Sequence, residues 1–258
     1  MKLIRSAAEE GVLTLSLNRA EKKNAVNGEL LVELESHLDR AAADASLRAV
    51  IVRGEGGCFC AGADLRELTN FSPEAMRAFH DLRERVLAKL EELPCPTFAA
   101  IEGFALGTGL ELALSTDFRV AAEGAALGVP SSLLGIVESH HYLARLVRSA
   151  GLSRARFLVL TGQRIGAAEA CAWGLVEKVF PDGELPGRVA QLAQAIAGHA
   201  PASVRLSKRI LGECDRDPYL REVADPGGAM AGAAGGAEMR EGTAAFVEKR
   251  RARFPAPD

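Results

Sequence analysis

The chain has 258 residues and a formal net charge of -3, with 48% hydrophobic and 25% charged residues. This size and composition are ordinary for a soluble globular protein with a sizeable core, and the small charge gives no reason to expect nucleic acid or an anionic membrane as a partner. No run reaches the ~18–20 apolar residues of a membrane span, and the first residues lack the long apolar segment of a secretory signal. The five cysteines lack disulfide-framework spacing, so we expect reduced thiols in a cytoplasmic protein.

Strand and helix patterns alternate through the first half of the chain. The predicted strands are short runs with alternating or β-branched apolar residues. They are residues 12–17, 49–52, 97–101 and 118–121. Asn27 and Ser72 are predicted N-caps of two helices with apolar stripes, and Pro94 ends the second helix. This recurring order of strand, loop and helix predicts an α/β protein with parallel strands.

The second half of the chain is predicted to be mainly helical, with one strand-like segment at residues 175–179. Residues 223–237 are rich in Gly and Ala, and we expect them to be weakly structured or mobile. A charged helix is predicted to follow over residues 238–250. Its apolar side chains need another surface to cover them, either the core or a second subunit.

Glu111 lies alone in an apolar segment, residues 105–114, directly after a glycine-rich turn. A buried carboxylate is costly unless it is paired or used. Gly103, Gly107 and Gly109 allow a tight loop that starts a helix, whose first N–H groups are free to bind negative charge. The pattern indicates a site for developing negative charge beside one carboxylate. The alternative is a core helix in which Glu111 pairs with an Arg or Lys.

A second glycine-rich segment, residues 56–65, also stands between a predicted strand and a predicted helix. The small residues Ala61, Gly62 and Ala63 would let a ligand approach the backbone closely. Asp64 is expected to cap the next helix rather than take part in chemistry. Two strand-ending loops that each offer one N–H group are what an oxyanion hole requires.

Other kinds of site fit the sequence less well. The glycines of residues 103–109 do not form G-x-G-x-x-G, which argues against a dinucleotide site. His140 and His141 beside Glu138 lack the spacing of a metal site. Cys58 and Cys60 form a C-x-C motif without the second cysteine pair that a zinc site needs. We therefore expect no bound metal.

Three longer motifs occur in the order that one known family shows. Residues 17–26 (LNRAEKKNAV) resemble L-N-R-P-E-K-x-N-A-L, and residues 59–65 (FCAGADL) resemble F-x-A-G-A-D-[LI]. Residues 101–111 (IEGFALGTGLE) resemble V-x-G-x-A-x-G-G-G-x-E. Further matching landmarks are residues 160–162, 172–176 and 238–250. Over nearly the whole chain the sequence therefore resembles the crotonase superfamily, the enoyl-CoA hydratase/isomerase family.

The resemblance implies an α/β fold with a crotonase-like ββα-superhelix spiral core. This core, with its acyl-CoA site, would take up residues 1–195. Residues 196–258 would form a helical C-terminal trimerisation region that builds a homotrimer or a dimer of trimers. The implied substrate is an acyl-CoA thioester, so coenzyme A enters as part of the substrate and no tightly bound cofactor is expected.

The resemblance also implies roles for individual residues. The N–H groups of Ala63 and Thr108 would form the oxyanion hole, and Glu111 would act as acid and base. Lys22 or Lys23 would lie near the coenzyme A phosphates. The residues expected to line the coenzyme A site are Lys22, Asn24, Ala25, Val26, Ala61, Gly62, Ala63, Asp64, Leu65 and Gly107.

Two positions depart from the family pattern. Thr108 stands where the family usually has a glycine, but threonine keeps the backbone N–H. Ser131 stands where the hydratases carry their second catalytic glutamate. Serine can orient water but does not titrate near neutral pH, and losing one general acid or base typically costs ~10²–10⁴-fold in rate. Efficient two-glutamate hydration is therefore not expected, unless Glu138, His140 or His141 supplies the missing group.

Several functions stay open at this point. Glu111 alone can shuttle a proton between carbons as an isomerase, or position one water for slow hydration. A malonyl-type acyl-CoA decarboxylase needs only the oxyanion hole, because the departing CO₂ leaves the enolate without a base. A non-catalytic acyl-CoA-binding homologue would keep the pocket without turnover. Retention of Glu111 and of both oxyanion loops favours an enzyme.

Overall fold

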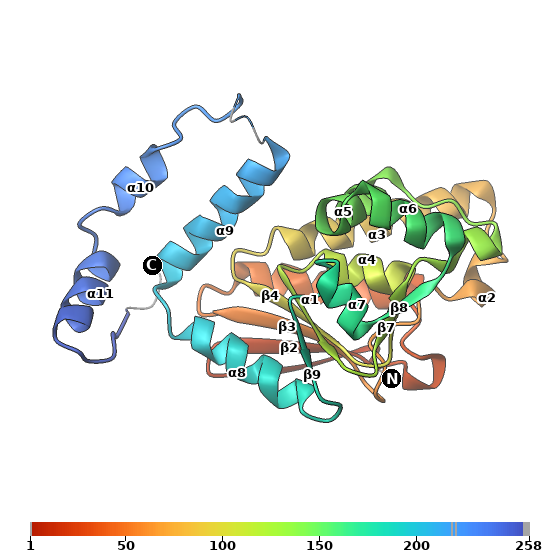
Figure 1. Ribbon diagram of the computed structural model, residues 1–258, viewed down its shortest axis with the longest axis horizontal. Coiled ribbons are helices and arrows are strands. Elements are labelled where there is room, and N and C mark those ends of the chain that lie inside the picture. The colour runs from red at the N-terminus through yellow and green to blue at the C-terminus, as the bar shows by residue number, and fades with distance from the viewer. Residues whose placement is uncertain (1, 218, 220, 255–258) are drawn as a thin grey trace.

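Figure 1 shows a computed structural model of the chain, which describes residues 2–217, 219 and 221–254. A six-stranded sheet runs through the body in the order β1-β2-β3-β4-β6-β9. Its strands are β1 (Ile4–Glu9), β2 (Val12–Leu17), β3 (Ala49–Gly54), β4 (Thr97–Ile101), β6 (Phe118–Ala122) and β9 (Lys178–Phe180). The first pair is antiparallel and every other neighbouring pair is parallel. The predicted α/β class with parallel strands is confirmed.

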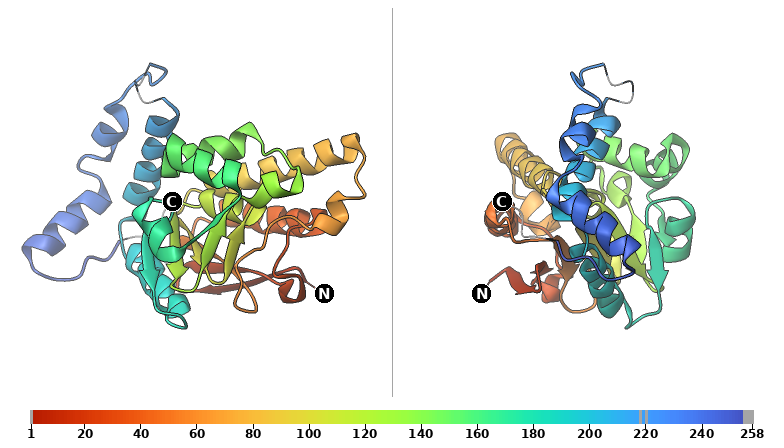
Figure 2. Two further views of the ribbon diagram at one scale, coloured as in Figure 1. Left: turned by 45° about the vertical axis from the view of Figure 1, so that its right-hand side comes forward. Right: turned by 90° about the vertical axis from the view of Figure 1, so that its left-hand side faces the viewer.

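Helices cover both faces of this sheet (Figures 1 and 2). In the central strand β3, Val50 and Val52 belong to the larger hydrophobic core, while Ala49 and Ile51 belong to the smaller core under α8. Burial on both faces explains why the first four residues of this strand, 49–52, are all apolar. The helices of the body are α1 (Gly28–Ala43), α2 (Leu65–Leu68), α3 (Pro73–Glu91), α4 (Thr108–Leu114), α5 (His140–Ala150), α6 (Leu152–Thr161), α7 (Ala167–Ala172) and α8 (Leu185–Ala197), with the 3-10 turns η1 (Ala20–Lys22) and η2 (Pro130–Leu134).

Side-chain caps fix the starts of α1 and α3, as the sequence predicts. Asn27 Oδ1 accepts a hydrogen bond from the Leu30 N–H at 3.1 Å. Ser72 Oγ accepts one from the Ala75 N–H at 3.2 Å, and Pro73 occupies the first turn of α3. Each cap satisfies an N–H group that has no acceptor within its own helix. Both predicted N-caps are confirmed.

A second sheet holds three short strands, β5 (Phe104–Leu106), β7 (Ala126–Gly128) and β8 (Arg164–Gly166). The chain turns from β4 into β5 at Gly103, which has a φ of +59°. A Cβ at this position would lie 2.7 Å from the carbonyl oxygen of Gly57, so only glycine fits the turn. The turn makes β4, β5 and α4 a ββα unit and leads directly to the start of α4.

Three helices form an arm outside the body (Figures 1 and 2). They are α9 (Pro201–Arg216), α10 (Gly228–Ala233) and α11 (Ala237–Val247). The expectation of weak structure over residues 223–237 is therefore wrong where α10 forms, since the alanines in it favour a helix despite the glycines. The predicted division at residues 195 and 196 falls close to the end of α8 and stays a prediction.

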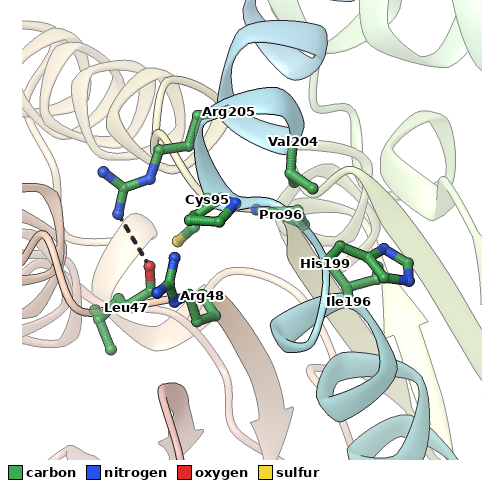
Figure 3. A pocket seen from close by; sticks show the side chains of 9 residues that line it. Leu47, Arg48, Cys95, Pro96, Ile196, His199, Val204 and Arg205 are labelled. Carbon is green, nitrogen blue, oxygen red and sulfur yellow. Dashed lines mark hydrogen bonds between the residues drawn. The ribbon is translucent and has the colours of Figure 1, made fainter. Parts of the chain in front are cut away.

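Helix α9 fastens the arm to the body. Arg205 Nη2 donates to the carbonyl oxygen of Leu47 at 3.1 Å (Figure 3), and Lys208 Nζ lies 2.7 Å from Asp117 Oδ2. The small pocket between α9 and the body has a lining that includes none of the predicted site residues. It is lined by Leu47, Arg48, Cys95, Pro96, Ile196, His199, Pro201, Val204 and Arg205. Among the described residues, no helix has the length and apolarity to cross a lipid bilayer.

Candidate functional site

The predicted site begins where β5 passes into α4. Gly107 makes this turn with φ 50° and ψ −121°, a conformation that favours glycine. A Cβ at Gly107 would meet no atom of the described residues within 4 Å, so open space lies in front of the turn. At Gly109 the opposite holds, because a Cβ there would lie 2.3 Å from the Cys60 carbonyl oxygen. Gly107 thus leaves the backbone open to a ligand, and Gly109 lets α4 pack closely against the loop that contains Cys60.

The second predicted loop runs beside the first. Cys60 and Ala105 form a parallel bridge, and Val26 and Ala63 form another. In the second bridge the Val26 N–H donates to the Gly62 carbonyl oxygen at 2.8 Å, and the Val26 carbonyl accepts from the Asp64 N–H at 2.7 Å. In this parallel pattern the Ala63 N–H points away from Val26, which leaves it free for another partner.

Ala63 and Thr108 stand at equivalent positions in the two loops. Each residue lies three positions after one member of the bridge between Cys60 and Ala105. Thr108 is the first residue of α4, so its N–H has no acceptor within the helix. Because Gly107 takes the left-handed dihedral angles, Thr108 itself has helical backbone geometry and its β-branched side chain adds no strain. The arrangement fits two N–H donors directed at one oxygen.

Glu111 lies one turn into α4 with its side chain 0% exposed. Arg83 Nε, from α3, lies 3.1 Å from Glu111 Oε2, and Arg145 Nη1, from α5, lies 3.5 Å from Oε1. Burial raises the pKa of Glu111 to about 8, against the opposing charges of the two arginines and with help from Glu84 and Glu138. A carboxyl group that keeps its proton near neutral pH can act as an acid.

Further ion pairs hold Arg145 in place. Arg145 Nε lies 2.6 Å from Glu91 Oε1, and its Nη1 lies 3.0 Å from Glu84 Oε2. The Ser139 hydroxyl donates to Glu84 Oε1 at 2.9 Å. Carboxylates outnumber guanidinium groups around the site, and we call this set the charged cluster. Its members are Glu84, Glu91, Glu111, Glu138, Arg83 and Arg145.

Ser131 and Glu138 meet across the turn between η2 and α5. The Ser131 hydroxyl donates a hydrogen bond to Glu138 Oε1. Ser131 is buried and Glu138 is half-buried, and the Glu138 charge contributes to the raised pKa of Glu111. His140 and His141 are exposed in the first turn of α5. Of the three candidates for the missing group, Glu138 is the one beside Ser131.

Two of the residues predicted to line the coenzyme A site hold the loops together. The buried Asn24 side chain donates to the Glu55 carbonyl oxygen at 2.9 Å and accepts from the Arg19 N–H at 2.9 Å. Asp64 accepts from the Arg66 N–H at the start of α2 and pairs with Arg19 Nη2 at 2.9 Å. The capping role predicted for Asp64 is confirmed. Their backbone N–H groups are paired as well, with the carbonyl oxygens of Arg19 and Val26, so both residues hold the two loops in shape.

The other predicted coenzyme A residues differ in exposure. Val26 and Gly62 are buried. Those that are half-buried or exposed are Lys22, Ala25, Ala61, Ala63, Leu65 and Gly107. Lys23 is exposed, and its Nζ lies 5.0 Å from the centre of the Phe104 ring. The Arg164 guanidinium, not among the predicted residues, lies 5.4 Å from the centre of the same ring and is a second cation beside it.

Sequence reasoning missed the groups that surround Glu111. Arg83, Tyr142 and Arg145 stand on α3 and α5, far from Glu111 along the chain. A charged residue in an amphipathic helix usually belongs to a solvated face. The only signal was the lone Glu111 itself, because a buried carboxylate requires partners from elsewhere.

The raised pKa of Glu111 predicts a stability that falls with rising pH. Its pKa is about 8 in the folded chain against an ordinary value of 4.5, so the folded state binds the proton more tightly. This contribution to the free energy of unfolding is fully present below pH 4.5 and is lost as the pH rises through 8. Urea unfolding at about pH 5.5 and about pH 8.5 should show that Glu111→Gln removes this part of the slope. The exposed control Glu123→Gln should keep it, and equal slopes in all three proteins would contradict the assignment.

Comparisons with known proteins give independent findings. A family model described as enoyl-CoA hydratase/isomerase matches residues 7–257. The 2,3-dehydroadipyl-CoA hydratase of Escherichia coli (strain K12) is 35% identical over 246 residues, which cover 95% of this chain and 96% of that protein. The short-chain-enoyl-CoA hydratase of Clostridium acetobutylicum is 35% identical over 247 residues, 94% of each chain.

A solved structure is similar over the same length. The crystal structure of an enoyl-CoA hydratase from Bacillus anthracis matches with a TM-score of 0.95 and 36% identity. The match covers 99% of this chain and 100% of that one. The crotonase-like α/β fold expected from the resemblance is therefore confirmed.

Proposed function

Because the chain belongs to the enoyl-CoA hydratase/isomerase family, we propose that it hydrates an enoyl-CoA thioester through an enolate held in an oxyanion hole. One observation carries this proposal: Ser131 binds Glu138 beside Glu111. Glu138 then supplies the second carboxylate that hydration requires and that Ser131 itself lacks. Isomerisation of the double bond uses the same enolate and Glu111.

The proposed oxyanion hole consists of the Ala63 and Thr108 N–H groups. Both are backbone donors, fixed by the bridge from Val26 and by the start of α4. Fixed donors need no rearrangement when negative charge develops on the thioester oxygen, which is the source of their effect on rate.

Thr108→Pro is expected to lower kcat/KM for crotonyl-CoA by ~10²–10³-fold, the usual loss for one oxyanion donor. Proline lacks the N–H but is tolerated in the first turn of a helix. The residue before a proline favours the extended region. Gly107, with φ 50° and ψ −121°, has the mirror image of that conformation, which glycine adopts as readily, so it should accept a proline at position 108. Thr108→Ala keeps the N–H and is the matched control. A folded Thr108→Pro protein as active as Thr108→Ala would remove this N–H from the oxyanion hole.

Glu111 and Glu138 have different surroundings, which suits them to different roles. Glu111, with a pKa raised to about 8 by burial, keeps its proton at neutral pH and acts as the acid. Glu138, held by the Ser131 hydroxyl, takes a proton from water while the water oxygen bonds to Cβ. Glu111 then gives its proton to Cα of the enolate. A proton passed from Glu138 to Glu111 restores the starting state.

The charged cluster favours hydration over decarboxylation of a malonyl-type thioester. Such a substrate carries a carboxylate, which would enter a site where carboxylates outnumber guanidinium groups. Like charges at close range in a poorly solvated site repel strongly. A neutral enoyl group avoids this repulsion. A non-catalytic acyl-CoA-binding protein would gain nothing from the buried Glu111, whose ionised form is costly to bury.

The coenzyme A part of the substrate is proposed to lie along residues 22–26 and 61–65. Lys22 and Lys23 belong to the first of these loops, and Arg164 lies over the same Phe104 ring as Lys23. Lys and Arg are the usual partners of phosphate groups. Asn24 and Asp64 would act by holding the loops, as their side-chain contacts indicate.

The arm formed by α9, α10 and α11 is proposed to contact other subunits of a homotrimer or a dimer of trimers. Phe246 and Val247 are 86% and 78% exposed, and Met230 is 76% exposed. Several large apolar side chains at such exposure on one arm are consistent with a surface that a second chain covers. A cytoplasmic location is likewise proposed.

A substrate panel tests the proposed function. Purified chain is mixed with crotonyl-CoA, a 3-enoyl-CoA or a malonyl-type thioester, and the products are identified by mass and chromatography. We expect 3-hydroxybutyryl-CoA from crotonyl-CoA at a rate well above the others. Release of CO₂ as the fastest reaction would replace hydration by decarboxylation. Binding of all three without turnover would leave a non-catalytic acyl-CoA-binding protein.

A further inference from the structure

Three buried polar atoms around Glu111 have no hydrogen-bond partner within residues 2–217, 219 and 221–254. They are Arg83 Nε, Glu111 Oε2 and Tyr142 Oη. Within the described residues, Arg48 Nη1 and Arg53 Nε are also buried without a hydrogen-bond partner. Unpaired buried polar groups are rare and cost free energy, so two of them near Glu111, together with its own Oε2, indicate a ligand.

Arg83 and Glu111 are close without satisfying each other. Arg83 Nε lies 3.1 Å from Glu111 Oε2, but its N–H does not point along the line that joins the two atoms. A hydrogen bond requires that alignment. Both atoms therefore keep an unused hydrogen-bonding position.

Tyr142 adds a hydroxyl group from α5. Its side chain is 0% exposed, and it lies three residues before Arg145, on the same face of the helix. Arg145 Nη1 reaches Glu111 Oε1 at 3.5 Å, so this face looks toward α4. Burial and the charges of Glu138 and Glu111 raise the pKa of Tyr142 well above its usual value. The hydroxyl therefore keeps its proton and remains a donor.

The chemistry of these atoms selects a neutral oxygen ligand. Arg83 and Tyr142 offer one N–H and one O–H donor, and the Glu111 carboxyl group keeps the capacity to accept whether or not it carries its proton. A water molecule can engage all three, which is about the usual number of hydrogen bonds for a buried water. The surplus of carboxylates in the charged cluster opposes an anion, and an apolar group would leave all three atoms unpaired.

We propose that the Tyr142 hydroxyl binds the oxygen of the attacking water, and the 3-hydroxyl oxygen of the hydrated product, in a subsite shared with Arg83 and Glu111. This inference rests on the proposed function and names its water site. Tyr142 donates to one lone pair of the water oxygen, while the other lone pair, released by Arg83, forms the bond to Cβ. One water proton passes to Glu138, and the electrons of the Cα–Cβ double bond move to the thioester.

Arg83 acts in the second half of the same reaction. When Glu111 gives its proton to Cα, its carboxylate gains a full negative charge in a buried position. Arg83 Nε, already 3.1 Å from Oε2, can then turn its N–H to that oxygen. Arg83 is in this sense a positioning residue for Glu111, whereas Tyr142 touches the reacting oxygen.

Tyr142→Phe tests the subsite because it removes only the hydroxyl. Two reactions are compared: hydration of crotonyl-CoA, and exchange of the Cα protons of butyryl-CoA in heavy water. Exchange needs the oxyanion hole and the ionised form of Glu111, which takes the Cα proton, but no water oxygen at Cβ, so it is measured at a pH above the Glu111 pKa of about 8. We expect kcat for hydration to fall about tenfold, the worth of one hydrogen bond, with exchange unchanged. KM for crotonyl-CoA should stay constant, whereas KM for 3-hydroxybutyryl-CoA in the reverse reaction should rise.

Controls separate the subsite from structural damage. The exposed Tyr219→Phe variant should match the wild type in both reactions. The melting temperature of Tyr142→Phe should not fall, because its hydroxyl has no partner among the described residues. Equal loss in both reactions, a lowered melting temperature, or unchanged hydration would each overturn the subsite. A wild type that shows neither reaction would instead overturn the proposed function.

Discussion

Replacing Glu111 by Gln is expected to lower kcat for crotonyl-CoA hydration by ~10²–10⁴-fold, the usual loss for one general acid or base. Gln has the same size and can stay beside Arg83 Nε and Arg145 Nη1, which lie 3.1 and 3.5 Å from the carboxylate. It cannot give a proton to Cα. Because an amide also avoids an ion in a fully buried position, the melting temperature should not fall.

The pH profile gives this experiment its control. Since the pKa of Glu111 is about 8, wild-type hydration should decline as the pH rises through that value and the acid loses its proton. Glu84 raises this pKa, so Glu84→Gln should move the decline to lower pH and leave the plateau rate in place. Equal losses of plateau rate in both variants would mean that the charged cluster, rather than Glu111 itself, is required.

Glu138→Gln is expected to lower the same rate about as heavily, by ~10²-fold or more, because it removes the base that takes the water proton. Ser131→Ala removes only the hydrogen bond that holds Glu138, and about a tenfold loss is expected. Both are measured with crotonyl-CoA at saturating concentration, with Cα-proton exchange of butyryl-CoA as a second readout. Exchange should survive in both variants, because it uses Glu111.

His140→Asn is the matched control for Glu138→Gln. His140 is two residues away and exposed, so its replacement should leave hydration unchanged. If Glu138→Gln hydrates as fast as the wild type, Glu138 has no part in the mechanism. If His140→Asn is the slower enzyme, the exposed histidine and not Glu138 completes the site.

Much of the main sheet could be predicted because its strands carry local patterns. β2 and β4 have the predicted bounds, since alternation marks residues 12–17 and a compact apolar run marks residues 97–101. β5, β7 and β8 have three residues each, too few for any periodicity. Residues 175–179 were predicted as a strand, but pairing with β6 begins only at Lys178. Leu175 and Val176 are apolar because they belong to the core.

The site was predictable where backbone geometry dictates residue type. Gly107 and Gly109 are required by a left-handed turn and a close contact, and both requirements act locally. Partners brought by other helices leave no local trace, which is why Arg83 and Tyr142 were missed. Glu138 was predictable only as one of three candidates. It is seven residues after Ser131, and the 3-10 turn η2 reverses the chain so that the two side chains meet.

One measurement tests the central claim, that Glu111 and Glu138 act together in one hydration step. Crotonyl-CoA hydration is followed by loss of enoyl-thioester absorbance for the wild type, Glu111→Gln, Glu138→Gln and the double variant. Residues that act as a unit give strongly non-additive losses. We therefore predict that the double variant is about as slow as the slower single variant. A double loss equal to the product of the two single losses, or no loss from Glu138→Gln, would contradict the claim.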